Sequence, residues 1–249
     1  MGSLSGKVVW ITGAGTGIGL GAAQALASAG ARVVMSGRRA PVLVLEAGRI
    51  ADGGGLAEAE PLDVRDAAAV RRVAEAIVSR HGGIDILVNS AGTNTPNRLW
   101  KNQSVEGWRE VLGINLDGSF NTLHAVLPGM RERRDGLVIN VSSWAGVFHP
   151  KLTGAAYNGS KHAVTAMTET INMEEGVNGI RACALCPAEV ATPILDSRPV
   201  PPSAEQRARM LQPDDLGRTI RFIAELPAHV CVNQLVISPT WNRMYIDNL

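Results

Sequence analysis

Short apolar runs alternate with longer segments of helical spacing along almost the whole chain, and this alternation constrains the fold more than any other feature. The apolar runs cover residues 7–11, 31–36, 55–63, 84–89, 136–142, 179–186 and 233–238. The helical segments cover residues 19–30, 40–52, 66–82, 104–133, 155–176 and 214–227. Strand alternating with helix predicts a parallel sheet covered by helices on both faces. The predicted fold class is therefore α/β, with a doubly wound, seven-stranded and mostly parallel sheet.

The size and composition of the chain narrow its class further. Its 249 residues and mass of 26.3 kDa suit one large domain over residues 1–249. Hydrophobic residues make up 45% and charged residues 19%, a balance that argues against extensive disorder. The formal net charge of +1 gives no electrostatic footprint for nucleic acid or an anionic membrane. We therefore expect a globular protein that binds neither.

The absence of targeting signals and the use of cysteine point to the cytoplasm. No apolar run approaches the length needed to cross a bilayer, and the N-terminal residues lead into a strand instead of a signal peptide. The Cys-x-x-Cys spacing of Cys183 and Cys186 is found in metal and redox sites, but no second pair lies nearby. We interpret both as buried structural thiols and expect no metal site. With Cys231 the number of cysteines is odd, which fits a reducing compartment.

A glycine-rich segment, TGAGTGIG, stands at the turn between the first predicted strand and the first predicted helix. In a doubly wound sheet this turn contributes most to the ligand site at the carboxyl ends of the strands. Glycines let backbone N–H groups and the helix N-terminus approach a pyrophosphate without Cβ clashes. The spacing is G-x-x-x-G-x-G, which departs from the strict dinucleotide pattern G-x-G-x-x-G. The segment predicts dinucleotide contacts from Gly13, Gly15, Thr16, Gly17, Ile18 and Gly19.

The end of the second predicted strand bears on the choice of dinucleotide. A site for NAD carries an acidic residue about 20 positions after the glycines, on the ribose 2′-hydroxyl. No Asp or Glu occurs between Gly19 and Glu46, and the strand ends instead with Arg38 and Arg39. Arginine pairs with the 2′-phosphate of NADP, which a carboxylate would repel. The alternative interpretation is that the two arginines only begin an exposed helix. We favour NADP(H) as the cofactor, with NAD(H) as the alternative.

A second group of residues has the composition of a proton-transfer site. Tyr157 and Lys161 stand four residues apart on a predicted helix, so their side chains share one face. A phenol titrates near pH ~10, and a nearby ammonium favours the phenolate and lowers that pKa. Ser142 and Ser143 end the strand before this helix and point to opposite faces of it. Each pattern is weak alone, because such pairs are common by chance.

Taken together and in order, these motifs resemble the short-chain dehydrogenase/reductase family, over residues 4 to about 239. The segments that carry the resemblance are TGAGTGIG, LDV at 62–64, NSAG at 89–92, GINLDG, VINVSSWAG, YNGSK and CPAEVATP at 186–193. Ser90 replaces a second Asn, Ala188 replaces a Gly, and the interval from Ser143 to Tyr157 is one residue longer than in the family. The last of these leaves Ser142 open as the alternative to Ser143. The resemblance implies a Rossmann fold.

The resemblance also implies roles for individual residues. Tyr157 would exchange the hydroxyl proton of the substrate and Ser143 would hydrogen-bond the same oxygen. Lys161 would bind the nicotinamide ribose and tune Tyr157, and Asn115, at a helix distortion, would connect Lys161 to water. Besides the glycine turn, the arginines, Tyr157 and Lys161, the implied cofactor contacts are Asp63, Val64, Asn89, Ala91, Gly92, Pro187, Val190 and Thr192. The implied activity is hydride transfer between NADP(H) and a small secondary alcohol or carbonyl compound.

The sequence constrains the substrate and the oligomeric state less than it constrains the fold and the cofactor. The proline-rich segment 187–212 is expected to form a substrate loop, and the pocket is expected to be walled by Trp144, Phe148, His149, Ile194 and Leu195, with no obvious charged anchor. The final third resembles the branch that oxidises serine-like 3-hydroxy acids. The family resemblance implies that helical segments 104–131 and 155–176 pair between subunits in a homotetramer, with a dimer as the alternative, unless their apolar stripes only cover the sheet. A non-catalytic NADP(H)-binding redox sensor is the alternative function, and the complete set of proton-transfer residues argues against it.

Overall fold

The computed structural model describes residues 2–246, so Met1 and residues 247–249, the ends of the predicted domain, lie outside the described residues. One seven-stranded sheet has the order β3-β2-β1-β4-β5-β6-β7, and all of its pairings are parallel. The strands are β1 (Val8–Thr12), β2 (Arg32–Gly37), β3 (Leu56–Pro61), β4 (Ile86–Asn89), β5 (Gly136–Val141), β6 (Ile180–Pro187) and β7 (Gln234–Ile237). The predicted seven-stranded, doubly wound α/β sheet is confirmed.

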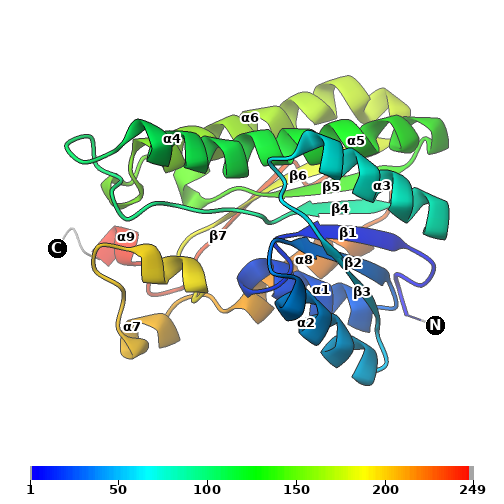
Figure 1. Cartoon of the computed structure of the whole chain (residues 1–249), viewed down its shortest axis with the longest axis horizontal. Helices are drawn as coiled ribbons and strands as arrows, with labels where there is room; N and C mark the ends of the chain where they lie inside the picture. Colours follow the sequence, from blue (N-terminus) through cyan, green and yellow to red (C-terminus); the bar gives the residue numbers. More distant parts are fainter. Residues whose placement is uncertain (1, 247–249) are drawn as a thin grey trace.

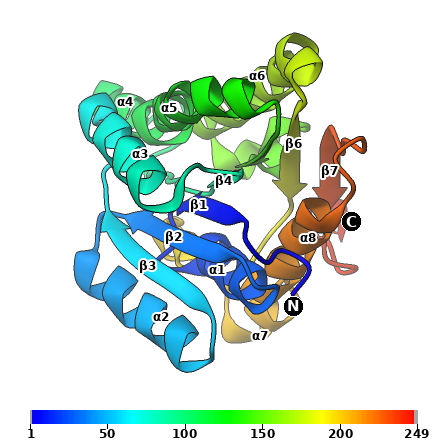
Figure 2. The same cartoon turned by 90° about the vertical axis from the view of Figure 1, so that its right-hand side faces the viewer.

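Helices cover both faces of this sheet, as Figures 1 and 2 show. One face carries α1 (Gly17–Ser28), α2 (Ala40–Asp52) and α8 (Pro213–Glu225). The other carries α3 (Ala67–His81), α4 (Val105–Leu112), α5 (Gly118–Arg133) and α6 (Ala155–Glu175). Two short helices, α7 (Ala204–Ala208) and α9 (Arg243–Ile246), lie at one end of the sheet.

The two faces of the sheet have separate apolar cores because side chains alternate along each strand. In β1, Val9 and Ile11 pack with the residues of α1 and α8, whereas Val8 and Trp10 pack with those of α3 and α5. Trp10 is fully buried, and its indole Nε1 donates to Ser36 Oγ at 2.9 Å. The nearly continuous apolar strands therefore follow from burial on both sides.

The segment predicted as one helix over residues 104–133 is divided in the structure. Between α4 and α5 the residues Gly113–Asp117 form a π-helical turn. A Cβ at Gly118, where α5 begins, would lie 2.4 Å from Val64 Cγ2, so the start of α5 packs directly against the residues that follow β3. The apolar period did not predict this turn, although the family resemblance placed a helix distortion at Asn115. A single π turn inside an α-helix is often found at functional sites.

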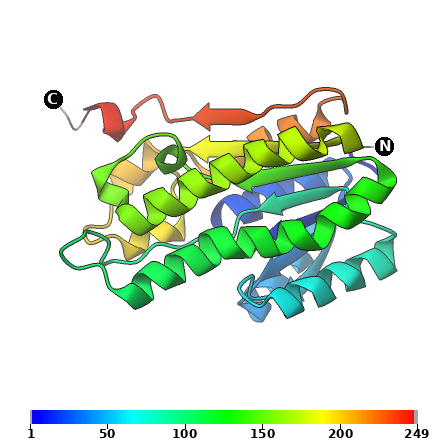
Figure 3. The same cartoon turned by 90° about the horizontal axis from the view of Figure 1, so that it is seen from above.

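The carboxyl ends of the parallel strands lie at one edge of the sheet. In Figure 3 the arrow of β7 points toward this edge, where α9 lies. The segment 188–212 lies here as well, and it contains a 3-10 turn (Pro193–Ser197) and α7. A bridge between Val190 and Leu211 joins its two ends. Loops from distant parts of the sequence therefore meet at one edge of the sheet, which is where doubly wound folds bind ligands.

Two further features concern the described residues as a whole. Among residues 2–246, no helix has both the length and the apolar character needed to cross a membrane. All three cysteines are free thiols. Cys183 and Cys186 are buried in β6, as expected, whereas Cys231 is exposed.

Candidate active site

A cleft with a volume of about 780 Å³ opens at the carboxyl edge of the sheet. The segments that follow β1, β2, β3, β4, β5 and β6 all contribute to its lining. Most of the predicted site residues line it: Gly13, Gly15, Thr16, Gly17, Ile18, Arg38, Arg39, Asp63, Val64, Ala91, Gly92, Ser143, Tyr157, Lys161, Pro187, Val190 and Thr192. Gly19, Asn89 and Asn115 do not. The fold thus brings residues from six separate segments into one cavity.

The glycine turn brings two loops into backbone contact. Gly13 has a φ of +65°, and a Cβ there would lie 2.7 Å from the carbonyl oxygen of Ser90, after β4. Thr12 Oγ1 accepts hydrogen bonds from the N–H groups of Ser90 and Ala91, each at 3.2 Å. Gly19 lies behind the turn, where a Cβ would be 2.4 Å from the Gly13 oxygen. The lack of side chains is therefore required by the protein's own packing as well as by any ligand.

The first turn of α1 is suited to an anion. Thr16 is its N-cap residue, but the Thr16 side chain makes no capping hydrogen bond, and no acidic residue lies in the first turn. The backbone N–H groups at the start of a helix have no intrahelical acceptor, and the helix dipole makes this end positive. Gly17 and Ile18 line the cleft at this point. This is the arrangement that binds pyrophosphate in dinucleotide sites.

Two exposed arginines lie beyond the glycine turn. Arg38 and Arg39 both line the cleft, and neither forms an ion pair within residues 2–246. Arg39 Nη2 donates to Thr16 Oγ1 at 3.4 Å. The neighbouring carboxylate, Asp63, is instead paired with Arg65 at 2.6 Å, and that hydrogen bond lowers the pKa of Asp63. Donors of both arginines therefore remain available to a ligand.

Tyr157 and Lys161 share one face of α6, as the spacing predicts. The Lys161 Nζ lies 5.7 Å from the centroid of the Tyr157 ring and donates to the carbonyl of Val141 at 2.7 Å. Burial lowers the pKa of Lys161 to about 8. Burial also raises the pKa of Tyr157, while a hydrogen bond with Ser143 opposes that rise. The phenol and the ammonium are thus held together in a partly dehydrated site.

The two serines at the end of β5 have different surroundings. Ser142 is buried, and its Oγ donates to the carbonyl of Lys161 at 2.9 Å. Ser143 accepts from the Ala145 N–H at 3.1 Å, and its side chain reaches Tyr157. The structure therefore brings Ser143 and not Ser142 to the phenol, even with the longer interval in the sequence.

Asn115 occupies the π-helical turn and is almost fully buried. Its Oδ1 accepts from the Thr93 N–H at 2.8 Å, and its Nδ2 donates to Ser160 Oγ at 3.1 Å. A Cβ at Gly92 would lie 3.6 Å from Asn115 Oδ1 and 3.7 Å from Lys161 Nζ, so both side chains approach that glycine. Asn115 therefore lies behind the cleft, near Lys161, with its amide engaged by the protein.

Asn89 lies beneath the cleft and is also engaged by the protein. Its Nδ2 donates to Asn140 Oδ1 at 2.9 Å, and its Oδ1 accepts from Thr122 Oγ1 at 2.7 Å. Asn140 in turn donates to Thr168 Oγ1 at 2.8 Å. This buried chain of hydrogen bonds joins β4, β5 and the helices above them. Asn89 does not line the cleft, and the cofactor contact predicted for it stays a prediction.

The substrate end of the cleft differs from the expected apolar pocket. Trp144, Ile194 and Leu195 line it as predicted. Phe148 and His149 do not: the ring of Phe148 stacks on Trp144 with centroids 4.3 Å apart, and His149 stacks on His162 at 4.5 Å. The sequence showed no obvious charged anchor, but three charged side chains also line the cleft: Arg98, Glu189 and Arg198. No motif marked any of the three.

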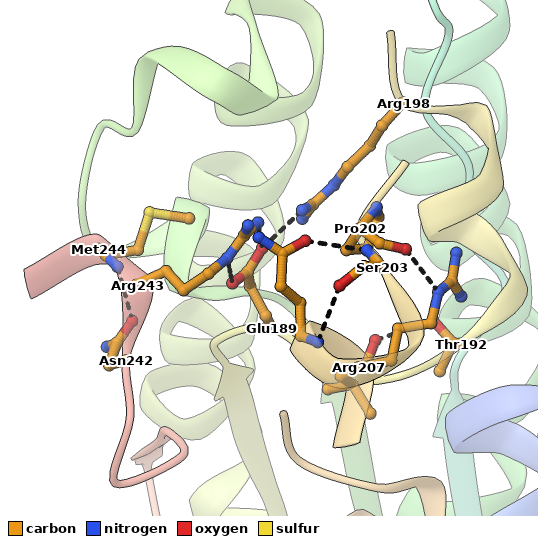
Figure 4. A network of polar contacts seen from close by, with 11 residues as sticks. Glu189, Thr192, Arg198, Pro202, Ser203, Arg207, Asn242, Arg243 and Met244 are labelled. Atoms are coloured by element: carbon orange, nitrogen blue, oxygen red, sulfur yellow. Dashed lines mark hydrogen bonds and ion pairs between the residues drawn. The ribbon is translucent and has the colours of Figure 1, made fainter. Parts of the chain in front are cut away.

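Glu189 joins the substrate loop to the last helix, as Figure 4 shows. It is buried, with Arg198 Nη1 at 2.5 Å and Arg243 Nε at 2.8 Å from its carboxylate oxygens. Burial alone would raise the pKa of Glu189, but hydrogen bonds from Arg243 and Arg198 outweigh it, so that the pKa is lowered. The last helix also supplies Met244 to the cleft lining. A segment to which the sequence assigned no chemistry therefore reaches the site.

The part of the chain that the structure describes contains no cluster of side chains suited to a metal ion. Within residues 2–246, no group of three or more His, Cys, Asp or Glu side chains is placed to hold a metal ion. The titratable groups of the cleft are instead a phenol, an ammonium, two carboxylates and several guanidiniums. The site can therefore transfer a proton and bind anions.

Comparison with known proteins identifies relatives of this arrangement. The family model of the short chain dehydrogenases matches residues 7–200. An uncharacterized oxidoreductase of Staphylococcus saprophyticus subsp. saprophyticus is 33% identical over 241 residues, which cover 96% of this chain and 100% of that protein. A serine dehydrogenase, solved in its closed form with NADP+, is 29% identical with a TM-score of 0.85, covering 93% of this chain and 94% of its own. The 3-ketoacyl-(acyl-carrier-protein) reductase of Brucella melitensis, solved with NADH, is 30% identical with a TM-score of 0.85, covering 94% and 98%.

Proposed function

The chain belongs to the short-chain dehydrogenase/reductase family, and from that premise we propose that it transfers a hydride between NADP(H) and a small secondary alcohol or carbonyl compound. The observation that carries the proposal is the contact of Ser143 with Tyr157, beside Lys161, in the same cleft as the glycine turn. A protein that only sensed the cofactor would need the glycine turn but not this group. Hydride transfer is therefore favoured over the sensor.

The cleft residues fit a dinucleotide. Gly13 and Gly17 have positive φ, and a Cβ at Gly17 would lie 3.0 Å from Thr192 Cγ2, across the cleft from the start of α1. The N–H groups of that turn would hold the pyrophosphate, with Asp63 and Val64 near the adenine. Val190 and Thr192, in the loop that follows β6, would hold the nicotinamide carboxamide. When bound, the nicotinamide supplies the hydride acceptor or donor, and the protein orients it.

The side chains of α6 and β5 would move the proton. In the oxidising direction the carbinol carbon loses a hydride with its electron pair, and the hydroxyl proton passes to Tyr157 Oη. Ser143 donates to the same substrate oxygen and stabilises its developing charge. With a pKa of about 8, Lys161 is mainly an ammonium at neutral pH, and it favours the phenolate form of Tyr157. Asn115 would connect Lys161 to water behind the cleft.

Selection of NADP(H) over NAD(H) rests on Arg38 and Arg39. Both line the cleft without an ion pair among the described residues, and no carboxylate ends β2. The relatives include a serine dehydrogenase with NADP+ and a reductase with NADH, so family membership alone does not choose between the two. Guanidinium groups at this point pair with a 2′-phosphate and gain little from a 2′-hydroxyl.

We also infer that residues 1–249 form one domain whose substrate loop is 187–212, and that four copies assemble in the cytoplasm. Exposed apolar side chains on α5 and α6 support the assembly, since Phe120 is 55% exposed and Met173 is 77% exposed. Burial of such residues stabilises contacts between subunits. Light scattering during size-exclusion chromatography tests this. A dimer is the alternative, and a monomer at micromolar concentration would contradict the assembly.

One pair of measurements tests the proposed activity. NADPH and NADH are titrated by fluorescence under identical salt, and NADPH consumption is then followed with a panel of small ketones, aldehydes and oxo acids. We expect tighter NADPH binding and turnover of at least one compound. Tyr157→Phe should bind NADPH as the wild type does and lose turnover by at least about a hundredfold, the scale of proton-transfer catalysis. Tight NADPH binding without turnover of any compound would favour the sensor instead.

A further inference from the structure

The loop between β4 and α4 buries an arginine that has no counterion. Arg98 is 4% exposed. Its Nε donates to the carbonyl of Thr95 at 2.7 Å, and its Nη2 donates to the carbonyl of Ser197 at 2.9 Å. Both acceptors are neutral, and no carboxylate within residues 2–246 pairs with it. Burial of an unpaired charge costs several kcal/mol. A bound ligand is therefore the expected source of the counterion of Arg98.

Part of this guanidinium is left free. Besides the two carbonyl contacts, the structure records one long contact from Nη2 to Ser197 Oγ at 3.5 Å. Nη1 makes no hydrogen bond to any described residue. Arg98 lines the same cleft as Tyr157 and Ser143. Its neighbours thus fix the guanidinium through two nitrogens and leave the third to a ligand in the cleft.

Arg98 is fixed in relation to the helix that carries Tyr157. Gly154, directly before α6, has a φ of +78°, and a Cβ there would overlap the carbonyl oxygen of Arg98, at 2.1 Å. Asn94, in the same loop as Arg98, donates from Nδ2 to the carbonyl of Thr153 at 2.9 Å. Burial raises the pKa of Tyr157, and the charge of Arg98 is among the interactions that oppose this rise. A group bound to Arg98 therefore lies near the proton-transferring hydroxyl.

A second arginine reaches this end of the cleft from the substrate loop. Arg198 pairs with Glu189, whose carboxylate is shared with Arg243 (Figure 4). Burial lowers the pKa of Arg98, and the nearby charge of Arg198 lowers it further, because the two guanidiniums repel one another. An anion close to both relieves that repulsion. Arg198 has a carboxylate partner and Arg98 has none among the described residues, so Arg98 is the guanidinium that lacks a counterion.

We propose that Arg98 binds a carboxylate of the substrate, so that the enzyme acts on small hydroxy acids and the corresponding oxo acids. This rests on the proposed hydride transfer at Tyr157. A carboxylate matches one guanidinium in charge, and its oxygens accept from the Nη1 group that the neighbours of Arg98 leave free. A phosphate monoester carries nearly two negative charges at neutral pH and matches less well. The carboxylate would orient the carbinol carbon toward the nicotinamide, with its oxygen between Ser143 and Tyr157.

Binding of simple analogues tests the anion site without turnover. Thermal unfolding of the cofactor-free protein is measured with butyrate, with the neutral butyramide and with propyl phosphate. We expect butyrate to raise the midpoint, butyramide to leave it unchanged and propyl phosphate to act less than butyrate. The effect of butyrate should vanish in Arg98→Gln and persist in Lys101→Gln, a matched loss of charge on the exposed part of the same loop. Equal effects of butyrate in the wild type and Arg98→Gln, or a stronger effect of propyl phosphate, would overturn the assignment.

Turnover separates this assignment from the proposed activity. With NADP+, we expect 3-hydroxybutyrate to be oxidised with a kcat/KM at least about tenfold above that of its methyl ester, and this ratio to fall to near one in Arg98→Gln. Arg98→Lys, which keeps the charge without the fork, should retain part of the preference if the Gln variant does not fold. An ester turned over as well as the acid refutes the carboxylate site and leaves hydride transfer standing. Butyrate binding through Arg98 with no hydroxy acid oxidised refutes the proposed activity and leaves the anion site standing.

Discussion

The two ends of the cleft present binding groups to a ligand in opposite ways. At the glycine turn the chain removes side chains, so that backbone N–H groups and the start of α1 are exposed in the cleft. At the substrate end it presents long charged side chains, Arg98 from the loop after β4 and Glu189 and Arg198 from the substrate loop, which are held by ion pairs and by backbone carbonyls. The first end is built from eight consecutive residues, the second from segments far apart in the sequence. The first is therefore visible in the sequence and the second only in the fold.

The largest effect is expected from disturbing the glycine end. In Gly19→Ala the new methyl group would lie 2.4 Å from the Gly13 oxygen, so the turn must shift. We expect NADPH affinity to fall by at least about a hundredfold and the free energy of unfolding to fall by about 2–3 kcal/mol, the cost of overpacking. Gly15→Ala is the control for stability, because its methyl group would meet Val42 Cγ1 at an ordinary 3.4 Å. Urea unfolding that gave equal losses for both variants would refute the steric argument.

Glu189→Gln disturbs the charged end. It preserves shape and leaves two arginines without their shared carboxylate, so we expect a loss of about 3 kcal/mol at neutral pH. The folded-state pKa of Glu189 is lowered, so its stabilisation is present above the unfolded-state pKa and is lost as the pH falls through the folded-state value. Urea unfolding should show that the difference in the free energy of unfolding between wild type and Glu189→Gln becomes smaller in acid. The control is Glu205→Gln, on an exposed pair with Arg209, which should change the free energy of unfolding little. A difference between wild type and Glu189→Gln that does not depend on pH would contradict the ion-pair explanation.

Lys161 lies between the two ends of the cleft, and the variant Lys161→Met tests whether its ammonium is dehydrated. The pKa of Lys161 is lowered to about 8, so the unfolded chain binds more protons above that pH and the wild type gains stability there. Without cofactor, the free energy of unfolding of the wild type should rise by about 2 kcal/mol relative to that of the variant between pH 8 and pH 10. Lys7→Met is the control of opposite sign. The pKa of Lys7 is raised by its carboxylate partners, so its contribution to stability declines as the pH rises through that value. A constant difference between wild type and Lys161→Met would show that Lys161 is not dehydrated.

The smallest effect is expected at the exposed arginines. Arg38→Ala should weaken NADPH binding by about tenfold, or ~1.4 kcal/mol, and leave NADH binding unchanged, because one partly solvated guanidinium–phosphate contact is lost. Arg72→Ala removes an exposed arginine from α3, outside the cleft, and should alter neither affinity. Fluorescence titration of each variant with NADPH and with NADH measures both affinities. A matching loss for NADH would place Arg38 away from the 2′-phosphate.

Most of the fold could be predicted because it depends on periodicity, which is local. The segment 40–52 coincides with α2, and each of the seven apolar runs overlaps a strand. The site was predictable where chemistry is tied to short motifs, such as Tyr157 and Lys161 one turn apart on α6. Arg98 could not be singled out, because its burial results from Gly154 and Ser197, which lie far along the chain. The same holds for α9, whose Arg243 meets Glu189 only after the chain has crossed the whole sheet.

The π-helical turn at Gly113–Asp117 closes its hydrogen bonds over one residue more than an α-helical turn does. An α-helix advances about 100° per residue, so deleting one residue inside the turn would restore a regular helix and keep the orientation of α5, whereas deleting one residue early in α5 would rotate the rest of that helix by about that angle. Thr122, Val126 and Met130, now buried against the sheet, would then turn aside, and the hydroxyl that Thr122 donates to Asn89 would be withdrawn. Natural variation in the length of this chain is therefore expected to spare α5 and to accumulate in segments whose packing does not depend on helix rotation.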